Sequence, residues 1–295
     1  MPTATSPDDT SSDDEARAST ARVRRVVQLL HALFAIRPAG LLTDVDGTIS
    51  RITAHTHDAT VQTETRRSLG RLTKQLDLVA VVTGRAVERA QQMVNVTGVA
   101  YVGNHGLEWL EAGIVRVNPA AEAARPALDA ALTAIHTAAP EPGVVVEDKR
   151  VSVAVHYRLT ADPHDAERRI LAAIRPFVDA TEQPPTLRLI QGGLVVNLLP
   201  SLAVDKGAAT LRLVQQHGLR SVAFFGDDVT DLDAFRALHA LRAEGAVATL
   251  AVGVGSAEGP PAVRAEADVM LEGVGEVERV LAALARKPTG YNPAH

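Results

Sequence analysis

The chain has 295 residues, of which 46% are hydrophobic and 22% charged, a composition typical of a globular protein with a substantial core. Its net charge of −5 leaves no overall basic field to neutralise phosphates, so nucleic acid is not expected as a partner. The lack of cysteine excludes disulfides, thiolate metal sites and cysteine nucleophiles, and it fits a reducing compartment.

The first residues differ from the rest in composition. Met1–Ser19 is rich in Ser, Thr and Asp and lacks the basic start and apolar middle of a signal peptide, so we expect a disordered acidic tail over residues 1–20. Because no uninterrupted run of about 18 apolar residues occurs, no membrane span is expected. These features together predict a cytoplasmic protein with no membrane partner.

The next hundred or so residues alternate between helical and strand patterns. Apolar residues at helical spacing predict a helix over residues 23–36, and a short apolar run predicts a first strand at 40–43. A helix over 61–74, a strand at 78–82, a further helix and a strand at 99–103 follow in chain order. This alternation is typical of a parallel sheet with right-handed crossovers.

The pattern changes near Ala112, where an inserted module of helices and antiparallel strands is expected. Its elements are a hairpin arm at 114–117, an alanine-rich helix at 120–137, a strand at 151–155, a helix at 163–179 and a hairpin of 187–190 with 194–198. The parallel pattern resumes with helices at 206–216, from 232 and at 274–285, and strands at 222–225 and 248–254. The predicted fold class is α/β, with a parallel-sheet core domain (21–112 and 200–290) and an inserted small α/β domain (113–199).

Two carboxylates, Asp44 and Asp46, follow the first predicted strand. Strand periodicity turns both toward one side, at the sheet edge where ligands bind in such folds. Asp44 is placed to attack phosphorus, while Asp46 could protonate the departing oxygen and later deprotonate water. Gly47 permits the tight turn that follows, and Thr48 can donate a hydrogen bond to phosphate. Alone, this motif also fits an ordinary Asp-rich turn.

A second carboxylate cluster follows the strand at 222–225. Asp227, Asp228 and Asp231 repel one another unless a cation is present, so the two clusters predict one shared site for a hard cation. Asp227 is the first choice as a direct ligand, with Asp228 and Asp231 acting through water or holding the loop. A solvated helix N-terminus, where Asp is favourable, is the alternative.

Three further residues, in two segments, fit a phosphate site. Thr83 and Gly84 end the second strand, where a hydroxyl and backbone N–H groups would bind a phosphate oxygen, although an ordinary N-cap threonine fits equally well. Lys206 begins a helix and offers a charge that would neutralise phosphate and keep Asp44 ionised, although a lone lysine is more often solvated.

These motifs, in this order and on these elements, resemble the haloacid dehalogenase (HAD) superfamily of phosphatases and, more narrowly, the trehalose-6-phosphate phosphatase family. Five strings within residues 40–285 carry the narrower resemblance: Gly103–Glu108, Glu147–Lys149, His156–Arg158, Asp205–Gly207, and Gly226–Asp231 with Ala234-Phe235. The resemblance implies a Rossmann-like HAD core with a cap domain at 113–199 that closes over the sugar. It also implies Mg²⁺ as cofactor, Asp44 as the nucleophile and Asp46 as the acid and base.

The resemblance extends to the individual ligands. The implied metal ligands are Asp44, Asp46, Asp227 and Asp228, and the implied phosphate-binding residues are Thr83, Gly84 and the catalytic Lys206. The implied sugar contacts are His105, Glu147, Lys149, Arg158 and Asn197. For Glu147 and Lys149 an exposed hairpin turn is the alternative.

The last cap strand departs from the family pattern, which runs Gly-Lys, a short apolar stretch, then Glu-x-Arg-Pro. Gly193, Asn197 and Leu199 replace the lysine, glutamate and arginine, and Asp148 stands where asparagine is usual. Asn197 can still hydrogen-bond a sugar hydroxyl, without the strength of a charged partner. These departures concern the sugar and leave the residues for dephosphorylation intact.

Three functions follow from these patterns. The leading hypothesis is a Mg²⁺-dependent phosphatase of trehalose biosynthesis, which hydrolyses trehalose 6-phosphate to trehalose and phosphate through an aspartyl-phosphate. The second is a HAD sugar-phosphate phosphatase with a different or broader substrate range. The third, a non-catalytic sugar-phosphate-binding module, is disfavoured because Asp44, Asp46, Lys206 and Asp227 are all present. A monomer acting on a small sugar phosphate is expected.

Overall fold

The structure is a computed structural model of the chain, and it describes residues 7–53, 58–179, 186–192, 194–255 and 259–286. Two compact units make up the chain. Unit 1 comprises Met1–Thr83, Ala90–Tyr101 and Lys206–His295, and unit 2 comprises Gly84–Arg89 and Val102–Asp205. No helix in the described ranges is long and apolar enough to cross a membrane.

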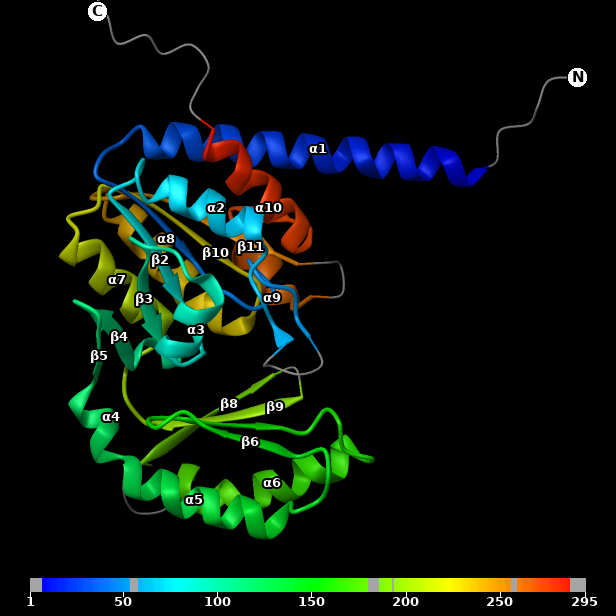
Figure 1. Cartoon of the computed structure of the whole chain (residues 1–295), viewed down its shortest axis with the longest axis vertical. Coiled ribbons are helices and arrows are strands. Elements are labelled where there is room, and N and C mark those ends of the chain that lie inside the picture. Colours follow the sequence, from blue (N-terminus) through cyan, green and yellow to red (C-terminus); the bar gives the residue numbers. More distant parts are fainter. Residues whose placement is uncertain (1–6, 54–57, 180–185, 193, 256–258, 287–295) are drawn as a thin grey trace, which may run out of the picture. The chain divides into compact units, whose positions relative to one another are not determined.

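Unit 1 is built around a mostly parallel sheet with helices packed on it (Figure 1). Its strands lie in the order β12-β11-β10-β1-β2, followed by β3. Its elements, including α3 and β3, which it shares with unit 2, are α1 (Pro7–Phe34), β1 (Ala39–Thr43), α2 (Thr63–Leu72), β2 (Leu78–Val82), α3 (Val87–Val94), β3 (Ala100–Gly103), α7 (Lys206–Gln216), β10 (Ser221–Gly226), η3 (Val229–Asp231), α8 (Leu232–Ala243), β11 (Ala248–Val254), α9 (Pro261–Glu266), β12 (Val269–Leu271) and α10 (Gly273–Leu284).

The two central strands bring their carboxyl ends to one edge of this sheet. β1 and β10 pair in parallel, in a register that runs from Ala39↔Ser221 to Thr43↔Phe225. Every residue of both strands is buried, as expected of a parallel sheet covered on both faces. The segments that follow, beginning at Asp44 and Asp227, therefore leave the sheet side by side.

Helix α1 corrects the expectation for the N-terminal segment. The helix predicted over 23–36 begins at Pro7, so the disordered tail expected over 1–20 is wrong for Pro7–Thr20, whereas residues 1–6 lie outside the described residues. Its partner is α10, which lies beside it (Figure 1). Ser19 and Arg22 both donate hydrogen bonds to Glu276 on α10, the latter from Nη2 at 2.8 Å. Hydrogen bonds between residues far apart in sequence thus hold α1 against α10, although the first half of α1 has little apolar periodicity.

Unit 2 contains a second sheet, which is antiparallel and has the strand order β6-β7-β9-β8. Helices α5 and α6 pack together on one of its faces (Figure 1). The further elements of unit 2 are η2 (Asn104–Gly106), β4 (Glu108–Glu111), β5 (Ile114–Val117), α4 (Pro119–Ala123), α5 (Arg125–Ala138), β6 (Val145–Asp148), β7 (Val153–His156), α6 (Pro163–Val178), β8 (Leu187–Gly192) and β9 (Val195–Pro200).

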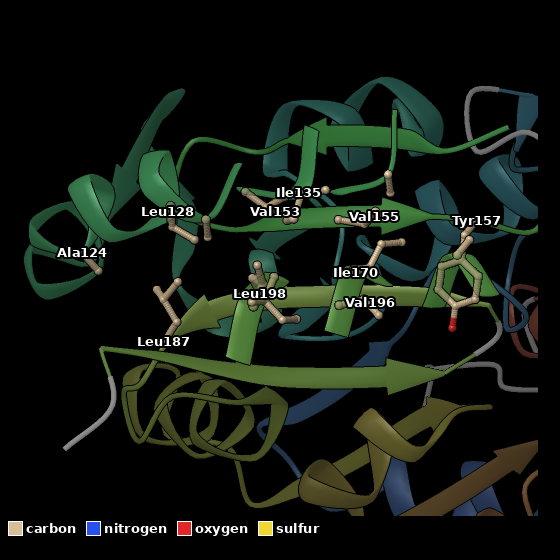
Figure 2. Packing of buried hydrophobic residues seen from close by; sticks show 14 residues of the cluster. Ala124, Leu128, Ile135, Val153, Val155, Tyr157, Ile170, Leu187, Val196 and Leu198 are labelled. Carbon is tan, nitrogen blue, oxygen red and sulfur yellow. The ribbon is translucent and has the colours of Figure 1, made fainter. Parts of the chain in front are cut away.

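The core of unit 2 lies between this sheet and its two helices. Figure 2 shows the side chains that meet there: Leu128 and Ile135 from α5, Ile170 from α6, and Val153, Val155, Val196 and Leu198 from β7 and β9. Alternate residues of β7 and β9 therefore face the helices, and the residues between them face the other side of the sheet.

Several predicted elements of the insert change in the structure. The helix expected over 120–137 is two helices, because Pro126 has no N–H and suits only the first turn of α5. The strand expected at 151–155 is shorter, because residues 145–156 form a hairpin of β6 and β7. Val151 lies in its turn and packs with Leu107 and Leu199 in a separate cluster. α9 and β12 were not predicted.

The α/β fold class is confirmed, whereas the assignment of core and cap domains stays a prediction. The expected insert, 113–199, lies wholly within unit 2, which also contains residues 84–89, 102–112 and 200–205.

Candidate active site

Three carboxylates of unit 1 meet beyond the carboxyl ends of β1 and β10. Asp44 follows β1, and its N–H donates to Phe225 O at 2.9 Å. One oxygen each from Asp44, Asp227 and Asp231 lies within 4.8 Å of the other two. An all-oxygen set at this spacing suits a hard divalent cation such as Mg²⁺ or Ca²⁺. Asp46 and Asp228, which the family resemblance also implies as metal ligands, are not part of this group of three.

Gly47 makes the close approach of the two loops possible. Its φ is +75°, and a Cβ there would lie 1.9 Å from Asp227 Oδ2, so a side chain would displace that carboxylate. Thr48 Oγ1 donates to Asp227 Oδ1 at 2.8 Å. Thr48, expected to bind phosphate through its hydroxyl, therefore orients a candidate metal ligand instead.

Lys206 lies between two of these carboxylates. Its side chain is 2% exposed, and Nζ lies 3.1 Å from Asp44 Oδ1 and 2.7 Å from Asp231 Oδ1. Asp231 Oδ2 accepts hydrogen bonds from the N–H groups of Asp227 and Asp228 at 2.9 and 3.0 Å. Because three of the roughly four lone-pair sites of Asp231 are used in this way, its main role is to hold the loop and the lysine.

Burial and crowding disfavour ionisation of this group when no cation is bound. Burial raises the pKa of Asp44 to about 7, with Lys206 opposing and Asp231 and Asp46 reinforcing the shift. Burial, followed by repulsion from Asp44 and Asp231, raises the pKa of Asp227 to about 9. A divalent cation would reverse both shifts because it favours the ionised carboxylates. The residues present thus fit a metal ion.

The second strand supplies the remaining predicted phosphate residues. Thr83 is buried directly after β2, and Gly84, the next residue, opens unit 2. A Cβ on Gly84 would lie 2.6 Å from the imidazole of His105, so the absence of a side chain lets that ring pack against the loop. His105 itself is buried and has a left-handed backbone with φ 56°.

Two of the residues predicted to hold the sugar, Glu147 and Asn197, lie on one face of the antiparallel sheet of unit 2. The register places Glu147 opposite Ala154 and Ala154 opposite Asn197, so the three share a face, the one directed away from α5 and α6. Lys149 lies in the turn after β6, where its Nζ donates to Gly84 O at 3.1 Å and lies 4.0 Å from Glu147 Oε2. Glu147, Lys149 and Asn197 thus belong to one region of unit 2.

His156 is a member of this face that sequence reasoning did not select as a site residue. Its Nε2 lies 3.6 Å from Glu147 Oε2. The nearby His156 imidazole, opposed by burial and supported by the charges of Lys149 and Arg85, lowers the pKa of Glu147. The available signal was alternation along the strand, which places His156 on the same face as Ala154.

The remaining positions that the sequence singled out are one predicted sugar contact, Arg158, and two departures from the family pattern, Leu199 and Gly193. Arg158 is exposed in the turn after β7. Leu199 is fully buried among apolar side chains and offers no polar contact. Gly193 lies outside the described residues.

Comparison with known proteins places these residues in a family. The family model described as trehalose-phosphatase matches residues 42–269. The chain belongs to the trehalose-phosphatase family. The matched range contains every residue of the candidate site, from Asp44 to Asp231, so the family assignment and the geometry concern the same part of the molecule.

Curated relatives of this chain include two mycobacterial proteins named trehalose-phosphate phosphatase. That of Mycobacterium tuberculosis is 36% identical over 228 residues, covering 72% of this chain and 56% of the relative. That of Mycobacterium ulcerans is 36% identical over 241 residues, covering 76% and 60%. A protein of M. tuberculosis named as an uncharacterised glycosyl hydrolase is 38% identical over 221 residues, covering 72% and 16%. The chain therefore spans little more than half of the first two relatives and a small part of the third.

Solved structures show the fold that this chain shares. The C-terminal domain of trehalose-6-phosphate phosphatase from C. albicans matches with a TM-score of 0.73 at 22% identity, covering 88% of this chain and 95% of that one. A haloacid dehalogenase-like hydrolase from Bacteroides thetaiotaomicron matches with a TM-score of 0.58 at 15% identity, covering 84% and 98%. The fold is that of the HAD-like hydrolases.

Proposed function

We propose that this chain hydrolyses trehalose 6-phosphate to trehalose and phosphate, with Asp44 as nucleophile and Mg²⁺ as the metal. The observation that carries the proposal is the buried group of Asp44, Asp227, Asp231 and Lys206 in a chain matched by the trehalose-phosphatase family. A cytoplasmic location and a monomeric state belong to the same proposal.

The reaction would proceed in two displacements at phosphorus. An oxygen of Asp44 forms a bond to phosphorus while the bond from phosphorus to the sugar oxygen breaks, and Asp46 protonates that oxygen. Water then attacks the aspartyl-phosphate, Asp46 takes its proton, and phosphate leaves with Asp44 restored. Lys206, 3.1 Å from Asp44, would keep the nucleophile ionised and oriented.

Metal and phosphate would be held by the remaining residues of the predicted set. Mg²⁺ held by Asp44 and Asp227, with Asp46 and Asp228 completing the proposed ligands, would neutralise charge that develops on the phosphoryl oxygens. Thr83 and the backbone at Gly84 would bind a phosphate oxygen.

Unit 2 would supply recognition of the sugar. Glu147, Lys149 and Asn197 offer a carboxylate, an ammonium and an amide, and His156 Nε2 lies 3.6 Å from the carboxylate of Glu147. Hydroxyl-rich ligands need such partners because a buried hydroxyl without one is costly. We propose the same role for His105 and Arg158.

The direct test is phosphate release by the purified protein with Mg²⁺, from trehalose 6-phosphate, glucose 6-phosphate and sucrose 6-phosphate. We expect trehalose 6-phosphate to lead by a factor of about 100 in kcat/KM, which corresponds to about 2.7 kcal/mol of discrimination. Asp44→Asn should abolish turnover of every substrate, because it removes the nucleophile while nearly preserving shape. Turnover that survives in Asp44→Asn would overturn the mechanism.

A second candidate function is a sugar-phosphate phosphatase with a different or broader substrate range. It is favoured by the last cap strand, where Leu199 is buried among apolar side chains and Asn197 has no charge. In the same experiment, a different leading substrate, or none, with turnover still dependent on Asp44 would support this candidate over the first.

A further inference from the structure

We propose that Asn104 and the Arg125–Asp148 ion pair are positioning residues, which hold Lys149 from two sides and so set the preference for a sugar phosphate over a small phosphate ester. The inference rests on the proposed function, because it takes Lys149 as a sugar contact. Asn104, Arg125 and Asp148 would act through the turn that carries Lys149.

This turn, Lys149–Ser152, joins β6 to β7 and is tight. Lys149 N–H donates to Ser152 O at 2.9 Å, and Val151 N–H donates to Lys149 O at 2.8 Å. Arg150 has a left-handed backbone with φ 69°, which is unfavourable for a residue other than glycine. Such a conformation persists only where the surroundings determine it.

Asn104 holds the turn from the interior. It is fully buried, its Oδ1 accepts from Ser152 Oγ at 2.6 Å, and its Nδ2 donates to Lys149 O at 3.4 Å. Its amide therefore contacts both ends of the turn. The left-handed backbone at Asn104, with φ 48°, is one that asparagine tolerates better than most residues.

The same residue is tied to the loop that begins at Gly84. Asn104 N–H donates to Arg85 O at 2.8 Å, and its side chain also hydrogen-bonds the buried carboxylate of Glu108. Glu108 Oε1 in turn accepts from Val87 N–H at 2.5 Å. Since Lys149 Nζ donates to Gly84 O, the lysine and the loop it contacts share one support.

Arg125 holds the turn from the outside. Its two terminal nitrogens donate to both oxygens of Asp148, at 2.6 and 2.7 Å, and Nη1 also donates to Arg150 O at 2.9 Å. Asp148 Oδ1 accepts from Arg150 N–H at 2.9 Å. A bidentate pair of this kind fixes direction as well as distance. An asparagine at 148 would offer this fork one oxygen instead of two.

The consequence concerns how strongly the position of Lys149 is determined. Its side chain is only 9% exposed, and the backbone on both sides of it is fixed by Asn104 and Arg125. If either support is removed, the turn can relax and Nζ is no longer held beside Gly84 and Glu147. A sugar that uses the lysine then binds less well, whereas a small ester that does not reach it is less affected.

The test compares Asn104→Gly and Arg125→Gln with the wild type, using trehalose 6-phosphate and p-nitrophenyl phosphate. Glycine at position 104 keeps the backbone conformation and the N–H group of Asn104. The control is Arg116→Gln, which breaks the exposed Arg116–Glu111 ion pair of the same unit. We expect the ratio of kcat/KM for the sugar phosphate to kcat/KM for the aryl phosphate to fall about tenfold in both variants, which corresponds to about 1.4 kcal/mol. The fall should come from a higher KM for the sugar phosphate. In the control variant the ratio should not change.

A second readout does not depend on turnover. The chain has four lysines, so acetylation of each can be followed by mass spectrometry, with the exposed Lys74 as internal reference. We expect acetylation of Lys149, relative to Lys74, to speed up about tenfold or more in both variants because local opening becomes easier.

The two proposals can fail separately. If the wild type does not hydrolyse trehalose 6-phosphate, the proposed substrate is wrong, and the ratio is then measured with the leading sugar phosphate of the panel. Equal losses on both substrates, or unchanged reactivity of Lys149, would overturn the positioning role. Because the Arg125–Asp148 pair is partly exposed, Arg125→Gln keeps the test decisive if Asn104→Gly does not fold.

Discussion

The charges around Asp44 do not balance without a cation. Three carboxylates and one ammonium, when all are ionised, carry a net charge of −2, which is the charge that one divalent cation neutralises. Lys206 alone leaves the pKa values of Asp44 and Asp227 raised, to about 7 and about 9. Binding of a metal ion is therefore expected to release protons from the carboxyl groups of Asp44 and Asp227.

This exchange predicts how Mg²⁺ binding depends on pH. The carboxylates must lose their protons to bind a metal, so affinity should rise between pH 6 and pH 8 and binding should release protons. Calorimetry in buffers of different ionisation enthalpy measures both quantities. Asp227→Asn should abolish the binding, whereas Glu64→Gln on the exposed surface of unit 1 should leave it unchanged. Affinity that is independent of pH over this range would contradict the prediction.

Sequence reasoning located these carboxylates but not all of their tasks. Asp44 and Asp227 were predictable because each follows an apolar strand, and parallel strands bring such ends together. The hydrogen bond from Thr48 to Asp227 depends on the register of β1 with β10, and the bond from Lys206 to Asp231 depends on how α7 packs, neither of which a local pattern specifies. The contact of His156 with Glu147 depends in the same way on the turn between β6 and β7.

At the scale of elements, helix α1 depends on a buried carboxylate. Glu276 on α10 accepts hydrogen bonds from Ser19 and Arg22 of α1 and from the N–H of Glu272. Burial raises the pKa of Glu276, but these hydrogen bonds outweigh it and leave the pKa below its ordinary value. The folded protein therefore stabilises the ionised form of the Glu276 side chain.

The sign of this shift predicts the effect of acid. A depressed pKa contributes stability above the pKa of the unfolded chain, near 4.3, and that contribution is lost as pH falls through the lower folded value. Glu276→Gln should therefore reduce the free energy of unfolding by about 1–2 kcal/mol at pH 7, and the difference from wild type should shrink below about pH 4. Urea titrations at both pH values measure it, with exposed Glu244→Gln as control. A difference that grows in acid would refute the assignment.

Elements with strong patterns were predicted closely, whereas those defined by distant contacts were not. The bounds of β2, α7 and β11 agree with the sequence prediction, because continuous apolar runs and a helical period are local signals. The first half of α1 has no such period, and the division of α4 from α5 depends on the geometry of one proline. The three-residue strand β12 is set by its pairing with β11 and is too short to predict.

At the scale of the whole molecule, all described residues of the hydrophobic cluster between the antiparallel sheet and its helices belong to unit 2. Its cluster extends from Ala124 to Leu198 in sequence and includes residues of α5, α6, β7 and β9. The inserted position of such a module was visible in the sequence as a change from parallel to antiparallel patterns. A compact unit with its own core is expected to respond to core mutations largely by itself.

Ile170 tests this expectation. The side chain is fully buried between α6 and the sheet, so Ile170→Ala should cost unit 2 about 2–5 kcal/mol through lost contacts and the cavity left behind. Hydrogen exchange should show faster exchange in β7, β9 and α5, with little change in β1 and β10. Ile114→Ala, the same substitution at an exposed position of unit 2, is the matched control and should leave both units protected. Equal loss of protection in β1 and β10 would mean that the two units unfold together, and the separate core of unit 2 would then carry no separate stability.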